Sequence, residues 1–418
     1  MSAPDERYLR VLERARQKRD SERSQETRLI REREDYFPGL DYFCSLLEEG
    51  ADPALLAART GKKPLAFLCL QAPLEIMWAQ GFAPLKIYSG SFGAANLTSP
   101  RLPALACPTV KAILGETELS PALVEIPWVL PLTCDWIVKF AETRAIFGDF
   151  PGPVHFLEVP RRKESPRACQ RFVAEIYAFS DFLRENGGIA LKRRNLEDSI
   201  RLLEEIRVVF GELIRLRRKG LVPLIYFSLI AASFFLDRPE KFLDSLREAA
   251  RHFREKGRES AAPQEGSGVF LSGSPLFFPN LKILHLLERA GLSVLGDDLC
   301  SGERIFPRHV EISDPSLDGL VDSLADAYHR GCLCPVFAEN ERRSAIIKEA
   351  TLEAAIRGVV FHSLKGCHPY DLDSFPLEEK LRSWGLKFLK IETDYSSEDS
   401  QNLLTRLEAF RPTLTSKR

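Results

Sequence analysis

The sequence lacks the features that export a protein or place it in a membrane. Its N-terminal residues contain no apolar core of a signal peptide. The longest apolar stretch, residues 221–236, is shorter than the roughly 20 residues that a membrane-spanning helix needs. We interpret this stretch as a buried helix, and we expect a cytoplasmic protein that has no membrane partner.

Common signals of nucleic-acid and nucleotide binding are also absent. The 58 Lys and Arg residues nearly balance the 59 Asp and Glu residues, so no strongly basic field attracts nucleic acid. Neither the phosphate-binding pattern G-x-x-x-x-G-K-[ST] nor the dinucleotide pattern G-x-G-x-x-G occurs. We therefore expect no nucleic-acid partner, and we expect that the chain does not itself hydrolyse ATP.

Disulfide bonds are not expected either. The chain has nine cysteines, and a reducing compartment favours free thiols or metal ligands over disulfides. Their spacing does not match a zinc finger or ribbon, which needs C-x-x-C pairs or His partners. A zinc-binding scaffold that uses Cys332 and Cys334 is kept as a rival interpretation.

The length of 418 residues predicts two or three domains. Short runs of Val, Leu, Ile and Phe alternate with helical segments in two stretches, and a region of helical periodicity lies between them. Such alternation is typical of parallel sheets that are covered by helices. We predict an α/β fold of two Rossmann-like, doubly wound parallel-sheet domains with an intervening helical layer. The predicted segments are a charged N-terminal helical arm (1–36), a first α/β domain (37–164), a helical bridging segment (165–260) and a second α/β domain (261–418).

Three cysteines lie at places where a ligand could gather. Cys134 and Cys367 each follow a short apolar run that predicts a buried strand, and Cys107 begins the segment Cys-Pro-Thr-Val-Lys. Ligands of open α/β sheets collect beyond the carboxyl ends of the strands. Thiols that are distant in sequence can converge there, and converging thiolates hold iron–sulfur clusters.

The remaining cysteines give weaker signals. Cys332 and Cys334 form a C-x-C pair directly after a predicted helix, where Gly331 and Pro335 favour a sharp turn. They are either metal ligands or two satisfied thiols at a helix end. We interpret three others as small core residues and leave a fourth, which follows a predicted strand, unassigned: Cys44, Cys69 and Cys169, and Cys300.

Three ionisable side chains are further candidates for chemistry. Glu75 lies on the first turn of a predicted helix after the first strand, where the helix dipole favours a carboxylate. It is a candidate general base or ligand-orienting residue, with a purely structural carboxylate as the alternative. His362 and His368 flank Cys367 and either contact a ligand there or simply fill space.

Several of these segments together resemble the 2-hydroxyacyl-CoA dehydratase component D family. That family also contains the benzoyl-CoA reductase subunits and the double-cubane cluster proteins. The resemblance covers roughly residues 64 to 411. It is carried by Pro73-Leu-Glu-Ile, Ala106-Cys-Pro, Leu132-Thr-Cys-Asp, Gly358-Val-Val-Phe-His-Ser-Leu-Lys-Gly-Cys-His-Pro-Tyr, Ile391-Glu-Thr-Asp-Tyr-Ser and Thr405-Arg-Leu-Glu-Ala-Phe.

The resemblance implies a set of cluster ligands. Cys107, Cys134 and Cys367 fall on the family's cysteine positions and would hold one 4Fe–4S cluster with one iron left open. Cys332 and Cys334 look more like the double-cubane branch, which binds an eight-iron cluster. Ser120 stands where that branch has a further cysteine, which counts against a complete double-cubane site.

The resemblance also implies an activity and partners. A separate ATP-dependent iron–sulfur activator would deliver one low-potential electron, and a homologous second subunit or a second copy of the chain would complete the enzyme. In the dehydratases the electron reaches the carbonyl of a CoA thioester, and the resulting radical expels a hydroxyl group. The expected activity is that of an oxygen-sensitive lyase or oxidoreductase acting on an acyl-CoA or a related small substrate. A double-cubane reductase of small molecules and a non-catalytic partner subunit are the alternatives.

Overall fold

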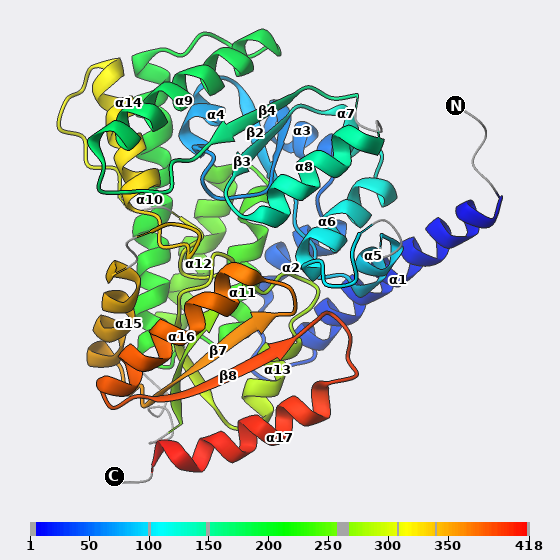
Figure 1. The fold of residues 1–418 in the computed structure, drawn as a ribbon, viewed down its shortest axis with the longest axis vertical. Helices are drawn as coiled ribbons and strands as arrows, with labels where there is room; N and C mark the ends of the chain where they lie inside the picture. Colours follow the sequence, from blue (N-terminus) through cyan, green and yellow to red (C-terminus); the bar gives the residue numbers. More distant parts are fainter. Residues whose placement is uncertain are drawn as a thin grey trace.

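The computed structural model describes residues 6–98, 102–147, 151–256, 267–306, 309–338 and 341–415. Two lobes lie one above the other in Figure 1, and each is built on a four-stranded sheet whose strands are all parallel. Helices cover the sheets and fill the space between the lobes. The predicted fold class, α/β with two doubly wound parallel sheets and many helices, is confirmed.

The first sheet has the strand order β2-β1-β3-β4. Its central strands are apolar because helices cover both faces of the sheet, and Trp128, Val129 and Leu130 are fully buried. The strands are β1 (Lys63–Phe67), β2 (Phe82–Lys86), β3 (Trp128–Leu132) and β4 (Val154–Glu158).

The second sheet has the strand order β6-β5-β7-β8, which repeats the order of the first. In each sheet the chain reverses its winding direction between the two central strands, β1 and β3 or β5 and β7. This reversal opens a crevice beyond the carboxyl ends of those strands. The strands are β5 (Gly268–Gly273), β6 (Ser293–Asp297), β7 (Gly358–Leu364) and β8 (Lys387–Thr393).

The helices of the first lobe include a long N-terminal helix that extends away from the body of the molecule (Figure 1). Its inner half packs against α2, α5 and α6. The helices are α1 (Glu6–Arg31), α2 (Asp41–Glu49), α3 (Pro53–Thr60), α4 (Leu74–Ala79), α5 (Phe92–Leu97), α6 (Pro108–Leu119), α7 (Ala122–Glu125) and α8 (Asp135–Phe147).

Helices α9 to α12 follow the first sheet in the sequence; α9 packs on β4 of the first lobe, and α10 to α12 form the bridging layer between the lobes (Figure 1). The long helix α10 contacts α4 of the first lobe and β6 of the second, because its apolar residues recur at helical spacing on the side that is buried. Helix α11 is buried on nearly all sides, as the sequence predicted for residues 221–236. The helices are α9 (Pro166–Glu185), α10 (Arg193–Arg218), α11 (Leu224–Ser233) and α12 (Pro239–Lys256).

In the part of the chain that the structure describes, none of the helices combines the length and the apolar character that a bilayer crossing demands.

Two helices of the C-terminal part of the chain have unexpected features, and the first of them, α14, lies beside α9 in the upper lobe of Figure 1. Helix α14 packs against α9 and α10 and continues as a π-helical turn, η3 (Asp326–Arg330). Helix α16 begins at His368, because Pro369 favours a helix start, and Pro376 is accommodated inside the helix. The helices are α13 (Lys282–Arg289), α14 (Leu317–Ala325), α15 (Glu341–Glu353), α16 (His368–Ser383) and α17 (Ser400–Phe410).

The predicted domain boundaries stay predictions. The strands of the two sheets fall within the second and the fourth predicted segments, and α9 to α12 fall within the third. The boundary predicted at residues 260–261 lies outside the described residues.

Candidate functional site: a thiol-lined cavity

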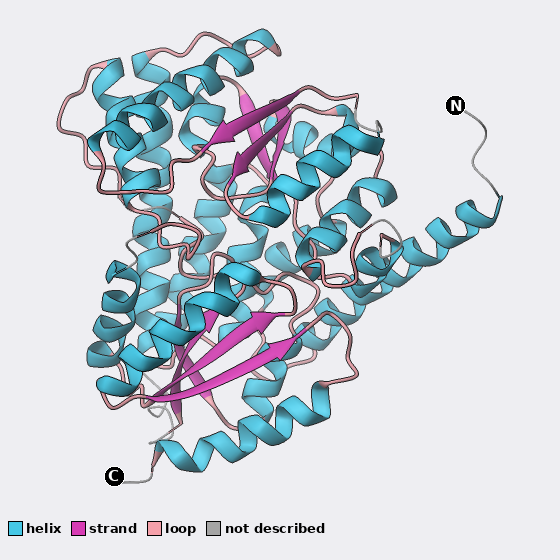
Figure 2. Cartoon of the chain, in the orientation of Figure 1, coloured by secondary structure: helices cyan, strands magenta, loops and turns pink. Residues whose placement is uncertain are grey.

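A cavity of about 310 Å³ lies where the two lobes meet. The carboxyl ends of both sheets point toward this middle region of the molecule (Figure 2). Seven of the nine cysteines line the cavity: Cys69, Cys107, Cys134, Cys300, Cys332, Cys334 and Cys367. All of them are free thiols.

The positions of four of these thiols are explained by the strand order, because each lies just beyond the end of a strand. Cys69 and Cys134 lie two residues beyond the ends of β1 and β3, the strands at which the first sheet reverses its winding. Cys300 and Cys367 lie three residues beyond the ends of β6 and β7 of the second sheet. The cavity thus occupies the position where parallel sheets bind their ligands.

Cys107 and Cys367 are in direct contact across the boundary between the lobes. Cys107 occupies the N-cap position of α6, where the backbone N–H groups of Thr109 and Val110 face its sulfur. The hydrogen bond from the Cys367 thiol, helped by these backbone groups, lowers the pKa of Cys107 to about 7 although burial opposes the shift. The same hydrogen bond and burial raise the pKa of Cys367 well above its usual value.

Cys134 lies close enough to Cys107 to interact electrostatically, and burial raises its pKa to about 12. The neighbouring residue Trp136 ties this segment to the second lobe, since its indole Nε1 donates a hydrogen bond of 2.7 Å to the carbonyl oxygen of Gly366. Cys107 therefore has both Cys367 and Cys134 as neighbours on the cavity wall, and both lobes contribute to this group.

Cys332 and Cys334 follow the π-helical turn that ends α14. Such turns are rare and are frequent at functional sites. The backbone N–H of Cys334 lies 3.5 Å from the sulfur of Cys332, and Lys163 donates a hydrogen bond to the carbonyl oxygen of Cys332. Burial raises the pKa values of Cys69, Cys332 and Cys334 to about 12. These thiols are protonated near neutral pH unless a metal ion binds them.

The rest of the cavity wall is mostly apolar, with two cations and one carboxylate, Glu303, which pairs with Arg217 and Arg218. Arg304 donates to the carbonyl oxygen of Asp298 and, over 2.6 Å, to the hydroxyl of Tyr370. Lys86 is the last residue of β2. The apolar surface is supplied by side chains of both lobes, among them Leu68, Ile87, Ile113, Phe277, Phe306 and Leu364.

The thiols are not already packed around a single point. Among the described residues, no three His, Cys, Asp or Glu side chains are gathered closely enough to bind one metal ion. A cubane does not need such an arrangement, because each of its thiolates binds a different iron. An apolar cavity ringed by thiols fits a sulfur-ligated cluster better than a single zinc ion, which is held by four ligands at once.

Glu75 lies behind the cavity wall. Its carboxylate is fully buried, accepts hydrogen bonds from Arg207 and, over 2.7 Å, from the hydroxyl of Tyr328, and does not line the cavity. Tyr328 does line the cavity, and its oxygen accepts a hydrogen bond of 3.0 Å from the backbone N–H of Leu74. Glu75 therefore reaches the site only through Tyr328, which belongs to the π-helical turn.

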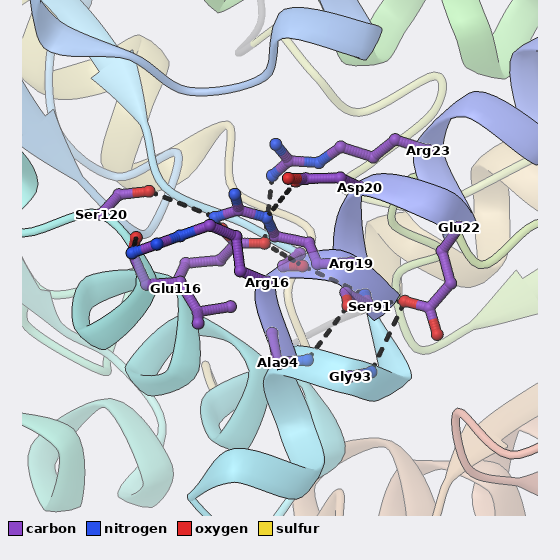
Figure 3. A network of polar contacts seen from close by, with 12 residues as sticks. Arg16, Arg19, Asp20, Glu22, Arg23, Ser91, Gly93, Ala94, Glu116 and Ser120 are labelled. Atoms are coloured by element: carbon purple, nitrogen blue, oxygen red, sulfur yellow. Dashed lines mark hydrogen bonds and ion pairs between the residues drawn. The ribbon is translucent and has the colours of Figure 1, made fainter. Parts of the chain in front are cut away.

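A polar network positions the helix that carries Cys107. Glu116 of α6 accepts hydrogen bonds of 3.1 Å each from Arg19 and Arg23 of α1, and Arg19 also donates to Ser120 (Figure 3). Glu22 of α1 accepts a hydrogen bond of 2.6 Å from Ser91, which caps α5 (Figure 3). These contacts fix α6, and hence its N-terminus at Cys107, against the N-terminal helix.

The comparisons with known proteins agree with this geometry. Residues 69–414 match the family model described as 2-hydroxyglutaryl-CoA dehydratase, D-component. The chain belongs to this family.

Three related proteins align with most of this dehydratase-family chain. The Escherichia coli (strain K12) protein YjiM, provisionally named a dehydratase subunit, is 26% identical over 82% of this chain and 89% of its own length. The (R)-phenyllactyl-CoA dehydratase beta subunit of Clostridium sporogenes is 22% identical over 85% and 93%. A benzoyl-CoA reductase subunit of Thauera aromatica is 21% identical over 80% and 85%.

Sequence reasoning missed two residues of the cavity. The interpretation of Cys69 as a small core residue is wrong, because Cys69 lines the cavity. Cys300 was left unassigned, and it lines the cavity as well. The signal that could have identified both is the one used for Cys134, since each follows the end of a strand.

Three other polar candidates lie away from the cavity wall. Ser120 is held by Arg19 at the end of α6, so its hydroxyl is engaged outside the cavity. His362 is buried and its Nδ1 lies 3.2 Å from the carbonyl oxygen of Ser274, and burial lowers its pKa to about 4. His368 is largely exposed, with its Nδ1 3.3 Å from Asp135. None of the three lines the cavity.

Proposed function

We propose that the chain is an iron–sulfur-dependent component of a 2-hydroxyacyl-CoA dehydratase or a related reductase. Cys107, Cys134 and Cys367 would hold a 4Fe–4S cluster in the cavity. The single observation that carries the proposal is the gathering of thiols from both lobes around one apolar cavity at the carboxyl ends of the sheets. When bound, a cluster of this kind takes up and passes on single electrons.

The residues of the chain would position the cluster, exclude water from the cavity and set the charge of its ligands. The apolar walls exclude water, and exclusion of water strengthens every electrostatic interaction inside the cavity. The backbone N–H groups at the start of α6 favour the thiolate form of Cys107. Glu75 contacts the cavity only through Tyr328, so we assign it a positioning role rather than that of a general base.

A second candidate is a reductase of small molecules that holds a larger, eight-iron cluster. The observation that favours it is the set of further thiols on the same cavity, Cys69, Cys300, Cys332 and Cys334. Cys332 and Cys334 project from one short turn, so they can reach neighbouring irons of a second cubane. A cysteine at the position of Ser120 is not needed for this set.

The proposed partners follow from the family. The relatives are named as subunits of a dehydratase and a reductase, so a homologous second subunit or a second copy of this chain is the proposed assembly partner. An ATP-dependent iron–sulfur activator is the proposed electron donor, and an acyl-CoA or a related small molecule is the proposed substrate. We place the complex in the cytoplasm, where thiols stay reduced.

Metal analysis after anaerobic reconstitution tests the proposal. About four irons and about four sulfides per chain are expected for one cubane, and about eight irons for the larger cluster. A chain that takes up no iron would be a non-catalytic partner subunit, and one that takes up zinc instead would be a scaffold held by Cys332 and Cys334. Either result refutes the proposed function.

Single cysteine variants test the ligands. Cys107→Ala, Cys134→Ala and Cys367→Ala should each lower the iron content, because each removes one thiolate from the cluster. Cys44→Ala is the matched control, since Cys44 is a buried free thiol that does not line the cavity. If all four variants retain full iron, the ligand set is wrong.

A further inference from the structure

Lys86 faces the thiol-lined cavity without an anionic partner. Its side chain is at the carboxyl end of β2, and the residue is only 3% exposed. In the described part of the chain, no carboxylate lies within ion-pair distance of its ammonium group and no acceptor forms a hydrogen bond with it. The groups around it are aromatic rings, with the ammonium nitrogen 5.6 Å from the centre of Tyr88, 5.5 Å from Phe235 and 5.2 Å from Phe277.

This environment does not compensate the charge of the lysine. Lysines are almost never fully buried unless they are paired, and moving an ammonium group out of water is costly. Cation–π contacts return only a small part of this cost. Burial accordingly lowers the pKa of Lys86, and the groups that oppose this shift are the thiols of Cys300 and Cys69. The cavity therefore holds a buried amine to which the described chain supplies no carboxylate, and an anion that enters the cavity would favour its charged form.

Other buried cations of the chain show what a balanced charge looks like. Lys282, which is also mostly buried, donates to the carboxylate of Asp399 over 2.6 Å and to three further oxygens of the same loop. Arg217 is fully buried and donates to Asp297 over 2.5 Å. Lys86 differs from both because the space in front of it is the cavity and not a carboxylate.

We propose that Lys86 is the counter-charge of a thiolate-bound iron–sulfur cluster in this cavity, on the side of Cys69 and Cys300. This inference rests on the proposed function. Thiolates make a bound cluster anionic, so an ammonium group that no carboxylate neutralises attracts it. A fixed positive charge nearby also favours the reduced cluster and raises its reduction potential. Lys86 acts here as a positioning residue, through its charge.

The proposal predicts effects of opposite sign in the two forms of the protein. Lys86→Met should raise the Tm of the iron-free protein, because it removes a buried amine that must either lose its proton or carry a charge without a carboxylate partner. In the iron-loaded protein the same change should lower the Tm, speed the loss of iron to a chelator and make the midpoint potential of the cluster more negative. The midpoint potential is measured by a redox titration that is monitored by electron paramagnetic resonance.

Two variants control for packing and for the general loss of a lysine. Lys86→Arg keeps the charge, so it should preserve the potential and the retention of iron. Lys282→Met removes a lysine that has its own carboxylate and should lower the Tm of both forms. Lys86→Gln, which is also uncharged, repeats the test with a polar side chain in case the Met variant does not fold.

The possible outcomes separate the two proposals. If the wild-type chain binds no iron under anaerobic reconstitution, the proposed function fails, and the counter-charge role fails with it. If the wild type binds iron and both uncharged variants match its iron retention and midpoint potential, only the role of Lys86 is overturned. A Tm change of the same sign in the iron-free and iron-loaded forms also overturns it.

Discussion

The buried ion pair behind the cavity gives the sharpest test of how this chain is held together. Glu75 and Arg207 are both almost completely excluded from water, and they come from α4 of the first lobe and from α10 of the bridging layer. Removing Arg207 leaves Glu75 as a buried charge whose remaining side-chain contact is the hydroxyl of Tyr328, whereas removing Glu75 leaves Arg207 its ion pair with Glu204. Arg207→Met should therefore lower the free energy of unfolding by about 3–5 kcal/mol, and Glu75→Leu, which removes one charged hydrogen bond, by about 1.5–3 kcal/mol.

The double variant measures the coupling energy between Glu75 and Arg207 separately from the cost of losing each side chain. If the single costs were additive, Glu75→Leu combined with Arg207→Met would cost about 4.5–8 kcal/mol. The double variant leaves no buried charge at the pair, and the main remaining loss is the hydrogen bond that Tyr328 donates to Glu75. Leaving that hydroxyl without an acceptor costs about 1–3 kcal/mol. We therefore expect a coupling energy of at least about 1.5 kcal/mol between the two positions.

Urea unfolding of all three variants and of the wild type measures this coupling. The unfolding slope must stay constant across the set, so that the midpoints report stability alone. A double variant as unstable as the sum of the single variants would refute the reasoning, and so would a single variant that costs less than about 1 kcal/mol. Tyr328→Phe is the matched control, because it removes the hydroxyl and leaves the ion pair intact.

Two further changes test how the cavity is positioned. Glu116→Leu should lower the free energy of unfolding by about 1.5–3 kcal/mol, because it removes the carboxylate that Arg19 and Arg23 share, although Arg19 keeps its ion pair with Asp20. The exposed Glu13→Ala should change it by less than about 0.5 kcal/mol, and urea unfolding checks both. Gly366→Ala should cost more than about 1 kcal/mol, because φ at Gly366 is +76° and a Cβ there would lie 2.0 Å from the carbonyl oxygen of Leu105. An unchanged Tm of this variant in thermal unfolding would contradict the backbone argument.

Much of the fold was predictable from the sequence because parallel sheets produce strong local patterns. The central strands are buried on both faces, so they read as continuous apolar runs that alternate with helices. The order of the strands was not predictable, since it depends on which strands pair across long crossovers. The packing of α14 against α9 and α10 was equally invisible, because the sequence gives the apolar face of a helix and not its partner.

The candidate site was predictable only where a residue follows an obvious strand. Cys134 and Cys367 could be placed this way, and Cys107 by the helix that it starts. Cys69 follows its strand equally closely, but its neighbours Leu68 and Leu70 made it resemble a core residue. Whether an apolar neighbour faces a core or a cavity is decided by tertiary packing, which one sequence does not reveal.

Glu75 shows a related limit of sequence reasoning. Its place at the start of α4, beyond β1, was correctly inferred from the strand and helix pattern. The partner that determines its role, Arg207, lies 132 residues away on α10. Because that contact is made through tertiary packing alone, no local pattern could distinguish a carboxylate aimed into the cavity from one aimed behind its wall.

The repeated strand order explains why the thiols meet between the lobes. Each sheet has its crevice at the carboxyl ends of its central strands, and the two crevices open into one cavity. Cys134 comes from one lobe and Cys367 from the other, so a cluster held by both would join the lobes covalently through metal. Binding free energy would then contribute to keeping the lobes together. Helix α10, which contacts both lobes, already sets their separation without metal. Chelation of iron should therefore loosen the cavity while the two sheets themselves remain folded.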